Sequence, residues 1–149
     1  MNAPIEALAD WARALLETSP VARLGLLDDH DDPRVLPITF VVWKGAIWSA
    51  IDRKPKRDPA REPARLRYLR RRPGVALTVD RYETDWEALA WVQVLGTAAI
   101  IDAAEAAEAM AALARKYEQY RAEPPPGPLI RIEPARTLSW RASPEAEKR

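Results

Sequence analysis

The chain has 149 residues, of which 48% are hydrophobic and 30% are charged, and its formal net charge is +1. These proportions are typical of an ordinary folded domain, and no apolar run approaches the roughly 18 residues that a membrane-spanning helix needs. The absence of cysteine excludes disulfides, thiolate metal sites, iron–sulfur clusters and cysteine nucleophiles. We expect one domain over residues 1–149, with no metal and no membrane segment.

Apolar residues recur at helical spacing from Ile5 to Leu16, after Pro4 and before Ser19-Pro20. This pattern predicts an amphipathic first helix within residues 1–20. The segment lacks a basic start followed by a continuous apolar stretch, so it does not resemble a secretory signal. We therefore expect a cytoplasmic protein.

Two apolar segments, Val21–Leu27 and Val35–Trp43, flank the turn-rich Asp28–Pro33 and predict a β-hairpin. Lys44-Gly45 predicts a second tight turn before a third strand over Ala46–Ile51. Three consecutive antiparallel strands form a meander, which argues against the βαβ units of a Rossmann fold.

A basic stretch follows, in which residues 53–72 include ten Lys or Arg and only two acidic residues. Leu66 and Leu69 have the spacing of one helix face, and Pro73-Gly74 would end that helix. The remainder of the chain is net acidic. Such a local asymmetry indicates an anionic partner for this region.

Val75–Asp80 predicts a fourth strand and Leu89–Ile101 a long fifth strand, in which Gly96 indicates a bulge or close packing. Tyr82–Trp86, between them, is expected to be an irregular loop. Asp102 with Glu105 resembles a capping box, which predicts a second helix to about Arg115.

Pro124–Pro128 forces an extended connection, after which Leu129–Trp140 predicts a last strand. Residues 143–149 are expected to be a polar tail. Six antiparallel strands with three helices predict a mainly β domain, a closed or nearly closed barrel with helices outside it.

The strongest candidate for binding is Lys54, Lys56 and Arg57, which directly follow a predicted strand. Alternate positions can converge on one ligand, and charge-assisted contacts from lysine and arginine suit a phosphate. On spacing alone, however, a solvated basic turn explains these residues more simply.

Three other patterns have simpler structural explanations. The arginines of 61–72 could line a nucleic-acid backbone, but the segment lacks interleaved aromatic residues and the rest of the chain is acidic. The Asp28–Asp32 turn lacks the glycine and distal glutamate of a calcium loop. The tryptophans, Trp86 among them, could form a core, a dimer interface or a wall for a flat ring.

No Ser/His/Asp set can be assembled around the single histidine, His30, and there is no Gly-rich phosphate loop. The catalytic residues are therefore unknown. Chemistry supplied by a bound cofactor is the more economical hypothesis.

Three sets of segments together are typical of a known family: Ala50-Ile51-Asp52 with Lys54-Pro55-Lys56-Arg57, Val79–Tyr82 with Asp85-Trp86 and Trp91-Val92, and Lys116-Tyr117 with Gln119-Tyr120-Arg121 and Pro125–Pro128. On these segments the chain, from about Val21 to Trp140, resembles the pyridoxamine 5′-phosphate oxidase-like split β-barrel proteins, and within them a group of coenzyme F420-dependent oxidoreductases. Arg81 stands where similar proteins commonly have histidine.

The resemblance implies a homodimer of six-stranded split barrels of the FMN-binding type, with cofactor sites at the subunit interface. Lys54 and Lys56 fall where such proteins place phosphate ligands, at the end of the third strand. The ring system or its ribityl chain would lie along Pro37, Ile38 and Thr39 on the second strand and Ser49, Ala50 and Ile51 on the third.

The resulting hypothesis is an F420-dependent oxidoreductase that transfers a hydride from the reduced deazaflavin to a small electrophile, with Tyr82 or solvent as proton donor. An FMN-binding oxidoreductase of the same fold is the first alternative. The broad basic helix favours the deazaflavin, whose oligoglutamate tail adds carboxylates. The second alternative is a barrel that only carries a flavin or tetrapyrrole.

Overall fold

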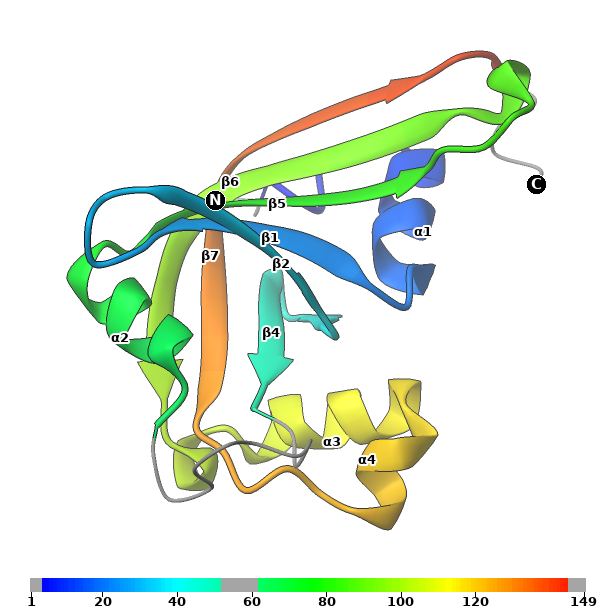
Figure 1. Ribbon diagram of the computed structural model, residues 1–149. Coiled ribbons are helices and arrows are strands. Elements are labelled where there is room, and N and C mark those ends of the chain that lie inside the picture. The colour runs from blue at the N-terminus through cyan, green and yellow to red at the C-terminus, as the bar shows by residue number, and fades with distance from the viewer. Residues whose placement is uncertain (1–3, 52–61, 145–149) are drawn as a thin grey trace.

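The computed structural model describes residues 4–51 and 62–144 (Figure 1). Seven antiparallel strands form one sheet in the order β2-β1-β5-β6-β7-β4-β3. The strands are β1 Ala22–Leu27, β2 Pro33–Ile38, β3 Val41–Trp43, β4 Ala46–Ala50, β5 Gly74–Arg81, β6 Ala90–Ile101 and β7 Leu129–Arg141. The α-helices are α1 Asp10–Thr18, α2 Ala64–Arg71, α3 Ala107–Lys116 and α4 Glu118–Ala122, and the 3₁₀ helices are η1 Trp86–Ala88 and η2 Ala103–Glu105.

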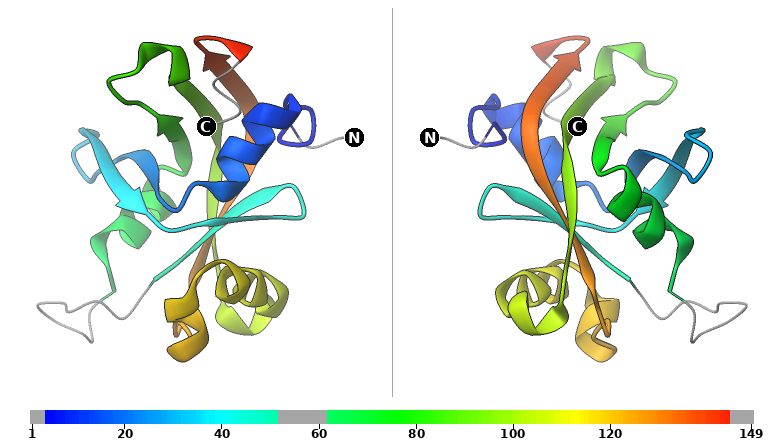
Figure 2. Two further views of the ribbon diagram at one scale, coloured as in Figure 1. Left: turned by 90° about the vertical axis from the view of Figure 1, so that its right-hand side faces the viewer. Right: turned by 90° about the vertical axis from the view of Figure 1, so that its left-hand side faces the viewer.

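The number of strands corrects the six-stranded prediction, because the segment expected to be one strand, Val35–Trp43, is two. β2 pairs with β1 and β3 pairs with β4, so the chain leaves one half of the sheet at Thr39-Phe40 and enters the other. β2 and β3 are the two edges of the sheet. The sheet therefore curls without closing by strand pairing. Figure 2 shows the curled sheet from two opposite sides.

The concave face of the sheet encloses the main core. Alternate residues of each strand point into it, so that β5 shows a regular inward pattern of Val75, Leu77 and Val79. α1 contributes Leu16, and α2 contributes Leu66 and Leu69 as its sequence spacing predicted. These apolar contacts hold both helices against the barrel.

A second, smaller core lies on the opposite face of β3, β4 and β7, under the pair of helices α3 and α4 (Figures 1 and 2). Ala50 and Leu129 from the strands pack there with Leu113 and Tyr120 from the helices. The end of the sheet formed by β7, β4 and β3 is thus covered on both faces, and β4 takes part in two cores at once.

β6 and β7 are the longest strands, and the bulge that Gly96 predicted lies between Leu95 and Gly96, opposite β7. A Cβ at Gly96 would lie 2.3 Å from the Glu133 carbonyl oxygen, so only glycine permits this approach. Beyond the bulge, β5, β6 and β7 project from the barrel as an arm with η1 at its tip (Figure 1).

Two helix boundaries differ from the prediction. The first helix begins at Asp10, because Pro4–Leu8 forms a turn, although Ile5 and Leu8 are still buried. The expected capping box is not formed: the Asp102 side chain makes no capping hydrogen bond, and η2 separates it from α3. α4 was not predicted, because its five residues are too few to show a period.

Candidate cofactor site

Four hydroxyl groups hold the backbone where the chain crosses from β2 to β3. We call Thr39, Phe40, Ser49, Tyr117 and Tyr120 the crossover cluster. The Ser49 hydroxyl donates to the Thr39 carbonyl oxygen at 2.7 Å, and the Thr39 and Tyr120 hydroxyls lie 2.6 Å apart. Side chains here replace the strand hydrogen bonds that the crossing interrupts, as buried backbone groups require.

Tyr117 is the central member of the cluster. Its hydroxyl accepts from the Phe40 amide at 3.0 Å and lies 2.9 Å from the carbonyl oxygens of Phe40 and Pro20. Burial raises the pKa of the Tyr117 phenol, so the group is protonated at neutral pH and can donate to these carbonyls. Its ring meets Tyr120 edge-on, with centroids 5.5 Å apart.

Lys116 precedes this tyrosine and lies beside the cluster. Its Nζ is 3.8 Å from the centroid of the Phe40 ring, and this nitrogen is buried with no hydrogen-bond partner among the described residues. Desolvation lowers the pKa of Lys116 to about 8, against a smaller opposing effect of Glu17.

The structure brings together the predicted ring-binding residues of the two strands. Pro37 is exposed and Thr39 is half-buried. The other four are buried: Ile38 and Ile51 belong to the main core, Ala50 belongs to the second core, and Ser49 donates to the Thr39 carbonyl oxygen. Only Pro37 and Thr39 present side-chain surface to a ligand within one chain.

The predicted phosphate ligands Lys54, Lys56 and Arg57 lie outside the described residues, and so do the acidic residue Asp58 and the start of the basic stretch. What the structure does place is the segment that leads to them. β4 ends at Ala50, beside the crossover cluster, and Ile51 is the last described residue before the gap.

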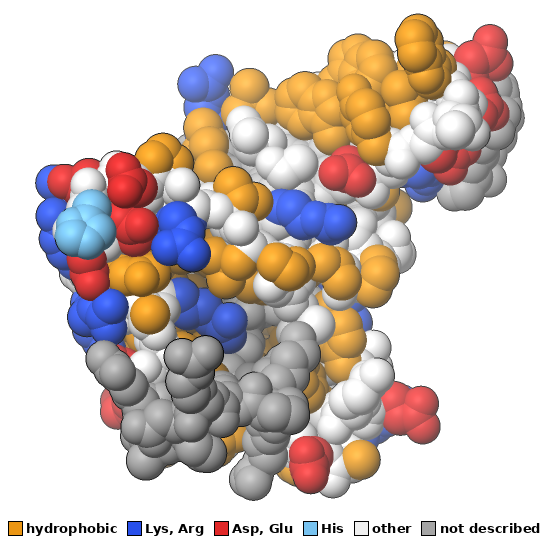
Figure 3. Space-filling view, in the orientation of Figure 1, with side chains coloured by type: hydrophobic (Ala, Val, Ile, Leu, Met, Phe, Trp, Pro, Cys, Tyr) orange, Lys and Arg blue, Asp and Glu red, His pale blue; other side chains and the backbone are white. Residues whose placement is uncertain are grey.

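Trp86 is not near the crossover cluster within the chain. It lies in η1 at the tip of the arm, away from β4, and is 77% exposed (Figure 1). Tyr82, suggested as a proton donor, lies in the same tip and is 66% exposed. Figure 3 shows hydrophobic side chains gathered along this arm.

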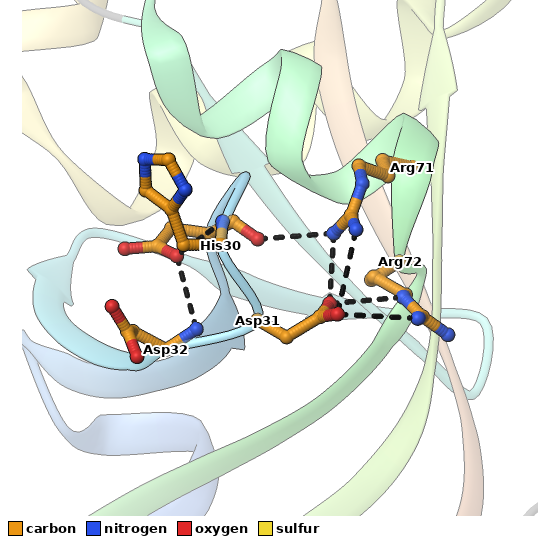
Figure 4. Close-up of polar contacts among 6 residues, drawn as sticks. His30, Asp31, Asp32, Arg71 and Arg72 are labelled. Carbon is orange, nitrogen blue, oxygen red and sulfur yellow. Dashed lines mark hydrogen bonds and ion pairs between the residues drawn. The ribbon is translucent and has the colours of Figure 1, made fainter.

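The four arginines of residues 67–72 are paired with acidic residues. Arg71 and Arg72 both bind the Asp31 carboxylate, at 2.8 and 3.1 Å (Figure 4). Arg67 binds Asp29 at 2.8 Å. Arg70 pairs with Glu62. The Arg71 guanidinium is the main reason why the pKa of Asp31 is lowered. The hairpin tip thus neutralises much of the helix that the sequence suggested as an anion-binding surface.

The Asp-rich tip itself has a structural role. The Asp28 carboxylate accepts from the His30 and Asp32 amides at 2.9 and 3.0 Å, which folds the turn back on itself. The His30 amide is the first cause of the lowered pKa of Asp28. In the described ranges, no group of three or more His, Asp or Glu side chains could hold a metal ion. No helix described there is long and apolar enough to span a bilayer.

Comparison with known families gives one match over most of the chain: the pattern of pyridoxamine 5′-phosphate oxidase matches residues 8–141. The chain belongs to the pyridoxamine 5′-phosphate oxidase family. This confirms the resemblance seen in the sequence. No curated protein sequence matches this family member significantly.

Solved structures share the fold at low sequence identity. A conserved hypothetical protein of Mycobacterium tuberculosis, Rv2991, has a TM-score of 0.71 and 20% identity, covering 95% of this chain and 89% of its own. An FAD-binding protein of Mesorhizobium loti has a TM-score of 0.62 and 16% identity, covering 89% of this chain and 94% of its own. A heme-binding protein of Mycobacterium smegmatis has a TM-score of 0.66 and 20% identity, covering 93% of this chain and 58% of its own.

The described residues fit part of a flavin-type cofactor. The half-buried Thr39 hydroxyl and the exposed Pro37 offer a polar group and a flat apolar surface beside a rigid backbone crossing.

Proposed function

We propose that this family member is an oxidoreductase that holds a flavin-type cofactor beside the crossover cluster, with the deazaflavin F420 as the first candidate. The observation that carries the proposal is that the Ser49 hydroxyl of β4 binds the Thr39 carbonyl oxygen, so that Thr39 lies beside β4. β4 is the strand that precedes Lys54, Lys56 and Arg57 in the sequence.

In this proposal each part of the chain has a separate task. Lys54, Lys56 and Arg57 hold the phosphate through charge-assisted contacts, and Pro37 and Thr39 orient the ring. The hydrogen bonds of Tyr117 and Ser49 fix the backbone on which the ring would rest. The bound cofactor supplies hydride transfer to a small electrophilic substrate.

We further propose a homodimer, in which the arm of one subunit covers the ring in the other. Trp86 and Tyr82 are large, mostly exposed aromatic residues at the tip of this arm. Such residues are enriched in interfaces, and their exposure supports a role that a single chain does not fulfil. Tyr82 as proton donor depends on this arrangement.

FMN is the second candidate. Arginines of α2 pair with Asp29, Asp31 and Glu62, which weakens the argument that they bind the carboxylates of an F420 oligoglutamate tail. In addition, a protein of similar fold from Mesorhizobium loti binds FAD. A non-catalytic carrier of a flavin or tetrapyrrole is the third, since the similar Mycobacterium smegmatis protein binds heme.

Titration of the purified chain with F420, FMN and heme, each separately, tests these candidates. We expect F420 to bind most tightly and, once reduced, to be reoxidised in the presence of a quinone or conjugated alkene. Preferential binding of FMN would replace F420 by the second candidate. Binding without turnover would support the carrier, and no binding of any of the three would contradict the proposal.

The phosphate anchor is tested by replacing Lys54 and Lys56 together with alanine. Loss of two charge-assisted contacts should weaken cofactor binding by on the order of 2 to 5 kcal/mol. Arg70→Ala is the matched control, because Arg70 is paired with Glu62 and its loss should leave the affinity unchanged. Unchanged affinity in the double variant would contradict the anchor.

A further inference from the structure

A hollow of about 420 Å³ lies on the outer face of the sheet, between the β3–β4 hairpin, β7 and the start of α3. Its floor is formed by residues of the strands and its roof by η2 and the first turn of α3. The lining residues are Trp43, Lys44, Ala46, Trp48, Ala104–Ala109, Arg131 and Glu133. We call it the outer hollow, and its volume lies within the range of about 300–1,000 Å³ that small-molecule pockets span.

The outer hollow is separate from the crossover cluster, because no residue of the cluster lines it. Successive residues of a strand also point to opposite faces of the sheet. On β4, Ile47 belongs to the main core and Ser49 reaches the Thr39 carbonyl, whereas Trp48 packs with the second core. On β7, Ile130 and Ile132 belong to the main core and Arg131 lines the hollow. A ligand in the hollow would therefore not touch the residues proposed to hold the cofactor ring.

Two unpaired hydrogen-bond donors meet at the floor. Trp48 and Arg131 are directly opposite each other on β4 and β7, and the Arg131 guanidinium lies 5.9 Å from the centroid of the Trp48 ring. The indole Nε1 and the guanidinium Nε are both buried, and neither has an acceptor within the part of the chain that the structure describes. Leaving such donors unpaired is costly, so an acceptor is expected there.

The other charges of the hollow are either paired or exposed. Lys44 Nζ binds the Glu108 carboxylate at 2.9 Å, and the Trp43 side chain also hydrogen-bonds this carboxylate. Glu105 and Glu133 are exposed to solvent, which screens their charge. Arg131 is thus the cation of the hollow that has a buried donor and no carboxylate partner among the described residues.

The shape of the hollow selects a flat molecule. Its floor carries two indole rings, Trp43 and Trp48, and the lining on the helical side is mostly alanine, whose small side chains leave the space open. α3 also begins there without a side-chain cap: its N-cap, Ala106, makes no capping hydrogen bond. Uncapped amides at a helix N-terminus favour a negative group nearby.

We propose that the outer hollow is a binding site for a small, flat aromatic carboxylate. The ring lies between the tryptophan floor and the alanine roof. The carboxylate accepts hydrogen bonds from Arg131 and Trp48, the two residues of the floor whose buried donors have no partner among the described residues. The site is separate from the cofactor and does not depend on which cofactor binds.

Calorimetric titration of the full chain with 2-naphthoate and with 2-naphthamide, its uncharged analogue, tests the proposal. We expect one saturable naphthoate site per chain. Arg131→Gln should weaken naphthoate binding about tenfold or more, as expected for a charge-assisted contact, and naphthamide binding by less than about threefold. Arg13→Gln, on α1 and paired with Asp10, is the matched control and should change neither affinity.

Ala107→Phe provides a test that leaves the core intact, because Ala107 is exposed at the start of α3 and lines the hollow. A phenyl group there should occupy the space and abolish binding of both probes. The double variant Lys54→Ala, Lys56→Ala should bind naphthoate as the wild type does; a loss there would place the probe in the cofactor site and overturn the proposal. Two other results would also overturn the proposal. One is the absence of saturable naphthoate binding, and the other is naphthoate binding that neither Arg131→Gln nor Ala107→Phe changes.

Discussion

Lys116 is held over the Phe40 ring by the last turn of α3, where its ammonium nitrogen is buried and has no acceptor among the described residues. The aromatic face offsets part of the cost of desolvation. The remaining cost appears as the lowered pKa of about 8. The unfolded chain, in which the ordinary pKa of 10.5 applies, therefore holds this proton more tightly.

The pH dependence follows from that difference. Between pH 8 and 10.5 the unfolded state binds more protons than the folded state. Lys116 therefore makes the free energy of unfolding rise with pH in this window, and below pH 8 Lys116 adds no pH dependence. Lys116→Met keeps an aliphatic chain of similar length without the charge. We expect this variant to be more stable than the wild type at pH 7.

Urea denaturation of the wild type and Lys116→Met from pH 7 to pH 10.5 measures this effect. The stability difference should shrink steadily above pH 8, as the wild-type amine loses its proton in the folded state. Lys44→Met is the control, since Lys44 is exposed and paired with Glu108. A difference independent of pH would contradict the assigned titration.

At the scale of the element, the pairing of β6 with β7 depends on one glycine. Gly96 lies at the register shift between the strands, and the backbone of β7 approaches within the space that a side chain would occupy. The contact is with backbone, which cannot rotate away as the end of a flexible side chain could. A larger residue here must move one strand relative to the other.

We expect Gly96→Ala to destabilise the fold by about 1–3 kcal/mol, as overpacking does. Gly74→Ala is a matched control, because an added Cβ at Gly74 has no atom within 4 Å. Gly74→Ala should leave the free energy of unfolding unchanged or raise it slightly, since alanine lowers the conformational entropy of the unfolded chain. Thermal unfolding followed by circular dichroism compares the two, and equal stabilities would contradict the steric argument.

The helices illustrate how tertiary contacts change the meaning of a charge pattern. The sequence predicted α2 from Leu66 and Leu69, and both are buried as expected. The same sequence suggested a free basic surface on the remaining faces. That suggestion could not account for Asp31, which is about 40 positions from Arg71 and Arg72 in the chain and is brought to them by the β1–β2 hairpin.

At the scale of the whole molecule, the sheet has apolar surface beyond that covered by the helices. A hollow of about 520 Å³ lies on the outer side of β1, β5 and β6, lined by Gly25, Ala76 and Gly96, and beside it Val35 of β2 is 72% exposed. Apolar surface of this kind marks an interface more often than an isolated residue does. It supports the proposed homodimer.

Val35→Glu tests this surface. The side chain is exposed within one chain, so the substitution should leave the monomer folded, while a buried carboxylate would oppose association. We expect a dimer for the wild type and a monomer for the variant in light scattering coupled to size-exclusion chromatography. Ala111→Glu, on the exposed face of α3, should remain dimeric. A dimer that tolerates Val35→Glu would place the interface elsewhere.

Much of the fold was determined by local patterns in the sequence. Apolar segments separated by turn signals predicted the strands β1, β4, β5 and β6, and alternation predicted β7. Lys44-Gly45 predicted the β3–β4 turn, and Gly96 indicated a bulge or close packing, both of which are found there. Each of these signals depends on neighbouring residues, whose preferences act within a few positions of the chain. Of the expected ring-binding residues, the structure joins Thr39 and Ser49 by one hydrogen bond, from the Ser49 hydroxyl to the Thr39 carbonyl oxygen.

Only the tertiary structure decided where the second strand breaks and what surrounds the site. Tyr117 lies 77 positions from Phe40 and Tyr120 lies 81 from Thr39, yet their hydroxyl groups hold the crossing. Trp48 and Arg131 are neighbours only because β4 pairs with β7. No local pattern contains these contacts, because they arise when the sheet curls and brings distant segments together.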